Sequence, residues 1–127
     1  MGTKQEPTDE ALRGRRYIAY ARCATAEGAE QRFREQIRLI HQFADGLNMH
    51  CAGEVRIANV NGWRPVMRPD LHELLARKRY RRDFEVLIME SYSRLSRAEP
   101  ENAAMIEMAF AARGVTLVYL DQMAARP

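Results

Sequence analysis

Short apolar runs rich in β-branched and aromatic residues alternate along this chain with longer segments of helical spacing. This alternation constrains the fold more than any other feature, because apolar residues recurring every three to four positions suit a helix and short apolar runs suit a strand. The expected strands cover residues 17–22, 50–57, 84–89 and 115–120, and the expected helices cover residues 29–47, 69–79 and 100–113. The β-α-β-α-β-α-β order predicts an α/β domain.

Local signals support these elements. Phe33 and Ile37 recur on one face of the first expected helix, Pro69 suits the first turn of the second, and Gly114 follows the third. Residues 84–89 (FEVLIM) form a nearly continuous apolar run, as expected for a strand buried on both faces. We therefore expect a mostly parallel sheet of four or five strands with helices on both faces. In such sheets ligands bind beyond the carboxyl ends of the strands.

The chain has 127 residues, of which 46% are hydrophobic, and this is sufficient for one compact domain with its own core. Residues 1–15 are polar and contain Pro7 and Gly14, so we expect them to form a flexible arm. Residues 16–122 would then form the domain, and residues 123–127 a short tail. The sequence shows no internal repeat and no second domain.

Several classes of protein are excluded by what the sequence lacks. No run reaches the roughly eighteen apolar residues of a membrane helix, and the charged N-terminal segment lacks the apolar stretch of a signal peptide. Cys23 and Cys51 form no CxxC motif, and the three histidines have no metal-ligand spacing. We therefore expect a cytoplasmic protein with no membrane partner, no metal and no cofactor.

Arginine dominates the positive charge. The chain has 20 basic and 17 acidic residues, a net charge of +3, and Lys4 and Lys78 are its only lysines. An arginine fork matches phosphate or carboxylate and stays charged when partly buried, although codon usage in a GC-rich genome gives the same bias. The basic run at residues 77–82 (RKRYRR) ends the second expected helix, where cations suit the helix dipole. We interpret that run as a solvated helix end rather than a DNA-binding patch.

A second group of arginines follows the expected strands. Arg22 follows the first strand, Arg94 and Arg97 follow the third, and the long loop before the second helix adds Arg64 and Arg68. If these guanidinium groups converge they repel one another unless an anion binds among them. Such forks bind phosphate oxygens and stabilise charge that develops during phosphoryl transfer. The alternative is an ordinary salt-bridge network with Glu90, Asp70 and Glu73.

Four blocks of the sequence resemble the catalytic domain of serine recombinases, the family of the resolvases and invertases. The blocks are YARCAT at residues 20–25, RPDLHELL at 68–75, LIMESYSRLSR at 87–97 and RGVTLVYL at 113–120. The family reads roughly YxRVST, RPGLxxLL, a VxxxDRLxR signature that ends the third strand, and GVxLxxL. The resemblance runs from Tyr17 to Leu120, and it implies a flavodoxin-like α/β domain.

The resemblance also implies a set of phosphate-binding and DNA-binding residues, each matching a position of the family pattern. These are Tyr20 and Arg22 of the first strand, Gln36 of the first helix, Arg68 before the second helix, and Arg94 and Arg97 of the signature. In the family the arginines hold the scissile phosphate and the leaving group. A serine attacks the phosphorus and forms a phosphoserine–DNA intermediate.

This chain departs from the family where the chemistry occurs. The position of the nucleophilic serine is Ala24, whose methyl group cannot attack phosphorus. Ser93 replaces the aspartate before the signature arginines, and the acidic residue expected after the second strand has only Asn59 or Asn61 as candidates. The chain ends at Pro127, before the family's long dimerisation helix and helix-turn-helix module.

Neighbouring side chains offer only weak substitutes for the nucleophile. Thr25 carries a hydroxyl group, but a shift of one residue on a strand end turns its side chain to another direction. Cys23 is the better nucleophile in principle, although the last residue of a buried strand is expected to be a small core residue. The hydroxyl groups of the third-strand loop can donate hydrogen bonds to a phosphate; they belong to Ser91, Ser93 and Ser96.

The pattern predicts a resolvase-like domain that does not cleave DNA but keeps an arginine pocket for phosphate. Such a domain would act as a DNA-associated accessory or regulatory protein, and would bind the DNA backbone, an active recombinase or a second copy of itself. Two alternatives stay open. One is an active recombinase or nuclease-like enzyme, and the other is a protein-interaction domain with no nucleic-acid role, for which Trp63 in the long loop is a candidate anchor.

Overall fold

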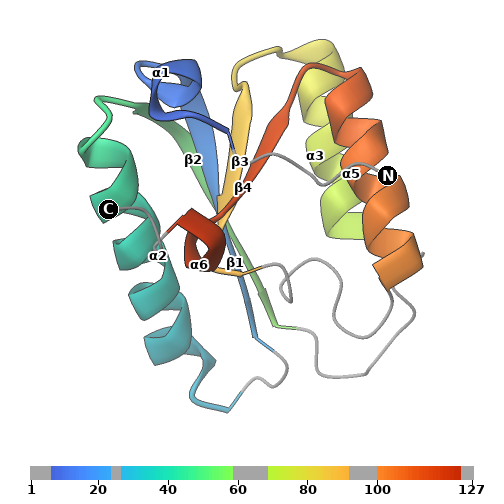
Figure 1. Ribbon diagram of the computed structural model, residues 1–127. Helices are drawn as coiled ribbons and strands as arrows, with labels where there is room; N and C mark the ends of the chain where they lie inside the picture. Colours follow the sequence, from blue (N-terminus) through green and yellow to red (C-terminus); the bar gives the residue numbers. More distant parts are fainter. Residues whose placement is uncertain (1–6, 24–26, 59–68, 92–99, 124–127) are drawn as a thin grey trace.

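A computed structural model of the chain describes residues 7–23, 27–58, 69–91 and 100–123. Within these residues, four strands form one all-parallel sheet in the order β2-β1-β3-β4 (Figure 1). The strands are β1 (Arg16–Cys23), β2 (His50–Ala58), β3 (Val86–Met89) and β4 (Thr116–Tyr119). The predicted parallel α/β fold is confirmed, and each predicted strand is present with its ends shifted by no more than two residues.

Helix α2 (Ala29–Asp45) covers one face of the sheet (Figure 1). Its buried side chains include Phe33, Ile37 and Ile40, which pack in one cluster with Tyr17 and Ala19 of β1. These helix residues recur every three to four positions, so the amphipathic pattern in the sequence correctly identified the face that meets the sheet.

The opposite face of the sheet is covered by helices α3 (Pro69–Tyr80) and α5 (Pro100–Ala112), which lie side by side in Figure 1. Tyr20 of β1, Leu74 of α3 and Phe110 of α5 meet in the second core cluster. Both helices begin at a proline, as suits a first helical turn. Because parallel strands are joined by helices that run back along the sheet, the N-termini of α3 and α5 lie where the strands end.

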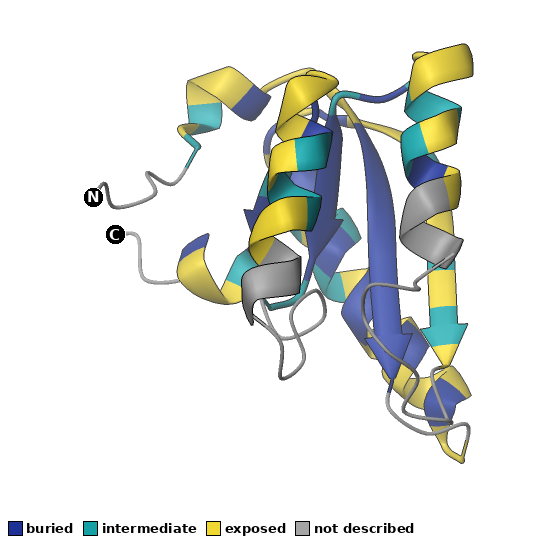
Figure 2. Ribbon diagram, turned by 90° about the vertical axis from the view of Figure 1, so that its right-hand side faces the viewer, coloured by how far each residue is buried: buried dark blue, intermediate teal, exposed yellow. Residues whose placement is uncertain are grey.

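The two central strands carry most of the buried backbone. Seven of the eight residues of β1 and all four of β3 are buried, whereas β2 at the border of the sheet alternates between exposed and partly buried residues. Figure 2 shows this contrast, with dark blue strands between helices whose outer surfaces are exposed. Successive residues of β1 point to opposite faces, so this one strand contributes side chains to both clusters.

Two short helices add to what the sequence predicted. Helix α1 (Asp9–Leu12) lies within the segment expected to be a flexible arm, and Leu12 is 1% exposed in the α2-side cluster. Thr8 caps this helix, and the amide of Gly14 donates to the carbonyl of Leu47. Helix α6 (Leu120–Met123) follows β4 directly. One buried apolar residue in a largely polar segment gives no periodicity, so the packing of α1 depends on tertiary contact alone.

A chain of polar side chains connects β1, α2 and β2 on the α2 side of the sheet. The hydroxyl of Tyr17 lies 2.5 Å from Nδ1 of His41, and Nε2 of His41 lies 2.7 Å from a carboxylate oxygen of Glu54. Burial raises the pKa of Tyr17, so its hydroxyl keeps its proton in this contact with His41. His41 then donates from Nε2 to Glu54, whose other oxygen pairs with Arg56 at 2.8 Å. The hydrogen bond from His41, together with Arg56, lowers the pKa of Glu54.

The lowered pKa of Glu54 predicts an acid-dependent loss of stability. Its carboxylate contributes fully above its ordinary value of 4.5 and loses that contribution as the pH falls through the lower value of the folded state. Glu54→Gln should reduce the free energy of unfolding by about 1 kcal/mol at neutral pH, and this difference should shrink in acid. Urea unfolding of both proteins at neutral and acidic pH measures it.

Glu35→Gln is the matched control, since Glu35 also pairs with an arginine at 2.7 Å but is exposed and lies on the same helix as its partner. Its effect should be only a few tenths of a kcal/mol. Equal effects of the two substitutions would mean that the connection through His41 adds nothing to stability.

Candidate functional site at the carboxyl end of the sheet

Strand β1 carries two predicted site residues, Tyr20 and Arg22, to the carboxyl end of the sheet. Tyr20 is completely buried and Arg22 is 4% exposed. Tyr20 belongs to the cluster beneath α3 and α5, and Arg22, two residues further on, lies on the same face of the strand. Burying a guanidinium group is costly unless anions or hydrogen-bond acceptors surround it. The strand therefore holds one permanent positive charge at the end of the sheet where ligands of this fold bind.

The side chain of Gln36 binds the backbone of Arg22 through both ends of its amide group. The Arg22 amide donates to Oε1 at 3.1 Å, and Nε2 of Gln36 donates to the Arg22 carbonyl, also at 3.1 Å. Pairing between β1 and β3 ends at Tyr20, opposite Met89. Arg22 lies two residues beyond this point, and the Gln36 side chain supplies the backbone hydrogen bonds that a neighbouring strand would otherwise make there.

Arg22 and Gln36 are also the two buried residues, among those described, whose side chains are charged or carry an amide. The paired hydrogen bonds satisfy the buried amide group of Gln36 and the buried backbone of Arg22, because a buried amide group or backbone group without a partner costs free energy. The sequence resemblance predicted both residues at the site. It assigned Gln36 to phosphate and DNA binding, whereas its amide contacts in the structure are to the backbone of Arg22 and, at 3.7 Å, the sulfur of Cys23.

Cys23 points away from the face that carries Arg22. It is 2% exposed, belongs to the cluster beneath α2, and its sulfur lies 4.0 Å from the carbonyl of Ala29. This agrees with the interpretation of Cys23 as a small core residue. A thiol in that position packs against α2 and does not face the arginine side of the sheet.

Several predicted site residues lie outside the described part of the chain. They are Ala24, Arg64, Arg68, Ser93, Arg94 and Arg97. The convergence of the arginines consequently stays a prediction, and so do the roles of Ala24 and Ser93. The described residues around them define the frame: β1 ends at Cys23, α3 begins at Pro69, and β3 ends at Met89.

Glu90, which the sequence offered as an ion-pair partner for the arginines, lies directly after β3. It lines a hollow of about 430 Å³ together with Phe43 of α2 and Leu120 of α6, and its carbonyl accepts a hydrogen bond from the amide of Asp121. This hollow is on the α2 side of the sheet, whereas Arg22 continues the side that carries α3 and α5.

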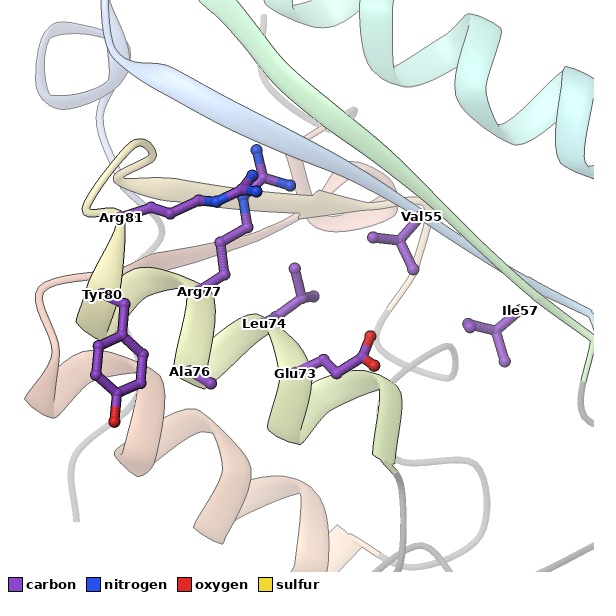
Figure 3. Close-up of a pocket in the computed structure, with 8 residues that line it drawn as sticks. All are labelled: Val55, Ile57, Glu73, Leu74, Ala76, Arg77, Tyr80 and Arg81. Atoms are coloured by element: carbon purple, nitrogen blue, oxygen red, sulfur yellow. The ribbon is translucent and has the colours of Figure 1, made fainter.

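A groove that the sequence did not predict runs between the border strand β2 and helix α3. Its volume is about 460 Å³. Figure 3 shows the lining residues, which are Val55, Ile57, Glu73, Leu74, Ala76, Arg77, Tyr80 and Arg81. Ile57 pairs in register with Arg22, so one end of the groove reaches the carboxyl end of the sheet. The groove forms because β2 and α3 lie close together in the folded protein, so no local sequence pattern predicts it.

The described residues contain no group of three or more His, Cys, Asp or Glu side chains that could hold a metal ion. Within the same part of the chain, no helix has the length and apolar character needed to cross a membrane.

Residues 17–127 match the family model described as the resolvase N-terminal domain. The chain belongs to this family. The match extends over nearly the whole sequence and includes all four blocks in which it resembles serine recombinases. No curated protein is similar enough to count as a relative.

Solved structures of serine recombinases share the fold of this resolvase-family domain. The C-terminal catalytic domain of ISC1926 TnpA, an IS607-like serine recombinase, has 23% identity and a TM-score of 0.65, with 82% of this chain and 69% of that chain covered. The N-terminal catalytic domain of TP901-1 integrase has 17% identity and a TM-score of 0.68, and the alignment covers 84% of this chain and 78% of that chain. The C-terminal catalytic domain of IS1535 TnpA, also an IS607-like serine recombinase, has 20% identity and a TM-score of 0.60, and the alignment covers 81% of this chain and 68% of that chain.

Gln36→Leu tests whether Gln36 positions the end of β1. The substitution leaves the buried amide and carbonyl of Arg22 without their partners, so the free energy of unfolding should fall by about 3 kcal/mol. Hydrogen exchange at the Arg22 amide should accelerate more than exchange at β3, because the lost bonds are local. Urea unfolding and native-state exchange measure the two effects.

The control is Gln31→Leu, an exposed position of the same helix, where the change should be within about 0.5 kcal/mol. If exchange at the Arg22 amide is unchanged in Gln36→Leu, the paired hydrogen bonds do not hold the strand end.

Proposed function

We propose that this resolvase-family domain binds the phosphate backbone of DNA at the carboxyl end of its sheet without cleaving it, and acts as an accessory or regulatory protein of recombination. The observation that carries the proposal is the buried guanidinium of Arg22 on a strand end held by Gln36. A buried guanidinium group on a strand end whose backbone is held has little freedom, so it stabilises an anion at a smaller entropy cost than an exposed, flexible side chain would.

The surrounding helices favour the same ligand. Helices α3 and α5 have 12 and 13 residues, and both direct their N-termini toward the carboxyl end of the sheet (Figure 1). The positive end of a helix dipole attracts an anion such as a phosphate. Arg68 directly precedes α3 in the sequence, and Arg94 and Arg97 fall between β3 and α5. The proposed pocket therefore combines Arg22 with arginines from the two connections that enter these helices.

The absence of cleavage follows from the side chain at position 24. In strand transfer by this family a serine oxygen forms a bond to phosphorus, the bond from phosphorus to a sugar oxygen breaks, and the serine proton is transferred to the leaving oxygen. Ala24 has no atom that can form the new bond. Ser93 also lacks the negative charge that would orient the neighbouring arginines. The domain would thus keep the groups that hold phosphate and lack the group that attacks it.

Restoring the nucleophile tests this proposal directly. The unaltered protein should form no covalent adduct with a nicked duplex, and Ala24→Ser combined with Ser93→Asp should form a detectable one if the arginine pocket is in place. The adduct is measured as a shifted band on a denaturing gel with labelled DNA. Arg94→Gln in the same doubly substituted protein should abolish the adduct, because it removes charge from the phosphate site and leaves the serine.

Two results would contradict the proposal. An adduct formed by the unaltered protein would show that another residue attacks phosphorus, and would favour the active recombinase. No adduct in the doubly substituted protein, combined with unchanged DNA affinity after Arg94→Gln, would show that the arginines do not hold a phosphate.

A further inference from the structure

Positive charge is concentrated at the amino end of the sheet, opposite the proposed phosphate pocket. The four segments that lead into the strands cover residues 13–16, 45–49, 77–85 and 113–115. Together they contain nine arginine and lysine residues and three acidic residues, whereas the whole chain has a net charge of +3. The excess charge of the protein is therefore located in these connections.

Backbone hydrogen bonds hold the starts of the four strands side by side, and with them the segments that lead into the strands. The amide of Gly14 donates to the carbonyl of Leu47, and the amide of His50 donates to the carbonyl of Arg15. The amide of Glu85 donates to the carbonyl of Arg16, and that of Thr116 donates to the carbonyl of Glu85. Residues far apart in the sequence are thereby held side by side at this end of the sheet.

Two of the three acidic residues of this surface already have arginine partners. Arg16 binds Glu85, with Nε 2.9 Å from the carboxylate, and Arg77 binds Asp83 with Nη2 at 2.7 Å. Hydrogen bonds from these arginines lower the pKa values of Glu85 and Asp83, so both carboxylates stay ionised and engaged. Arg77 also donates to the carbonyl of Ala52 at 2.7 Å, which ties α3 to the border strand.

Five exposed arginines of this surface remain without a carboxylate partner in the described part of the chain, and three of them, Arg79, Arg81 and Arg82, come from one segment; the other two are Arg15 and Arg113. Among the described residues, no carboxylate forms an ion pair with any of them. The dipole of α3 accounts for cations in its last turn, but Arg81 and Arg82 lie beyond the end of that helix at Tyr80. The interpretation of residues 77–82 as a solvated helix end therefore explains the cations within α3 but not Arg81 and Arg82.

The groove in Figure 3 is lined by two arginines of the same surface. Arg77 and Arg81 direct their guanidinium groups toward its amino end, where Arg77 engages Asp83 and Arg81 also lies close enough to lower the pKa of that carboxyl. Tyr80, 78% exposed, lies between these positions in the sequence and stacks near Arg79 at 5.7 Å. Two guanidinium groups with one carboxylate leave a net positive charge that attracts an external anion.

We propose that this amino-end surface, centred on Arg79, Arg81 and Arg82, binds the phosphate backbone of duplex DNA. Regularly spaced phosphates match several separate arginine forks, each of which binds phosphate oxygens. A protein partner fits less well, because the centre of a protein interface is rich in apolar groups, and Tyr80 is the only large exposed hydrophobic residue that the described part of this surface offers. The surface is separate from the pocket at the carboxyl end, and its function does not depend on that pocket.

The test compares two doubly substituted proteins that lose the same charge. Arg79→Gln with Arg81→Gln removes two cations of the amino-end surface and leaves Arg82, whose φ of 52° is left-handed, undisturbed. Arg34→Gln with Arg38→Gln removes two exposed cations of α2. Binding to a short labelled duplex is measured by fluorescence anisotropy over a range of salt concentrations, and urea unfolding confirms that both proteins are folded.

The amino-end variant should bind about tenfold or more weakly near 0.1 M salt, and its plot of log affinity against log salt should become shallower by about one to two units. The α2 variant should bind nearly as the unaltered protein does. The proposal is overturned by any of three results: no salt-dependent binding by the unaltered protein, unchanged binding by the amino-end variant, or equal weakening in both variants.

A third variant separates this proposal from the one concerning the phosphate pocket. If Arg94→Gln with Arg97→Gln leaves duplex affinity unchanged while the amino-end variant loses it, the pocket proposal fails and the amino-end surface stands. The reverse pattern overturns the amino-end surface and leaves the pocket in place. Loss in both variants supports two separate contacts with DNA.

Discussion

Burial of strand β1 from both sides is the constraint on which the other features of the domain depend. Its side chains alternate between the cluster under α2 and the cluster under α3 and α5, and seven of its eight residues are buried. It also pairs with both β2 and β3. Any displacement of this strand would disturb both cores and both neighbouring ladders, so its position is closely determined. Arg22 is placed at the end of the sheet by that packing.

The contact between Gln36 and Arg22 extends this control past the point where pairing with β3 ends. Gln36 of α2 makes the backbone hydrogen bonds that a strand would make, so the position of α2 on the sheet also determines where the Arg22 backbone lies. Contacts further along α2 stabilise the same arrangement, because His41 connects Tyr17 of β1 to Glu54 of β2. The geometry of the site therefore depends on interactions along much of the helix.

The two ends of the sheet use arginine in different ways. At the carboxyl end Arg22 is buried and its backbone is held, which suits recognition of one phosphate in a fixed position. At the amino end the arginines are mostly exposed and come from several connections, which suits a repeating polyanion. The helix dipoles differ as well, since the N-termini of α3 and α5 point to the first end and their C-termini to the second.

Much of the fold could be predicted because the sequence encodes it locally. Period and composition located all four strands and the three long helices, and the apolar run at β3 correctly indicated a strand buried on both faces. Short elements escaped prediction: α1 rests on the single buried side chain of Leu12, which creates no pattern. The family resemblance predicted Tyr20, Arg22 and Gln36 as site residues; the structure places the first two near the end of β1 and Gln36 against the Arg22 backbone, and their phosphate-binding roles stay predictions. The resemblance did not reveal that the Gln36 amide binds backbone, since residue type does not specify the partner of a hydrogen bond.

The sequence by itself determined the order of strands and helices, the membership of the resolvase family and the alanine at position 24. Each of these is a property of neighbouring residues or of residue identity. Tertiary structure alone decided which of the arginines share a surface, because Arg16 and Arg82 are separated along the chain and meet only where parallel strands begin together. It also decided which carboxylates are already engaged. Charge in a sequence can be counted, but the charge left over at a surface depends on pairing in space.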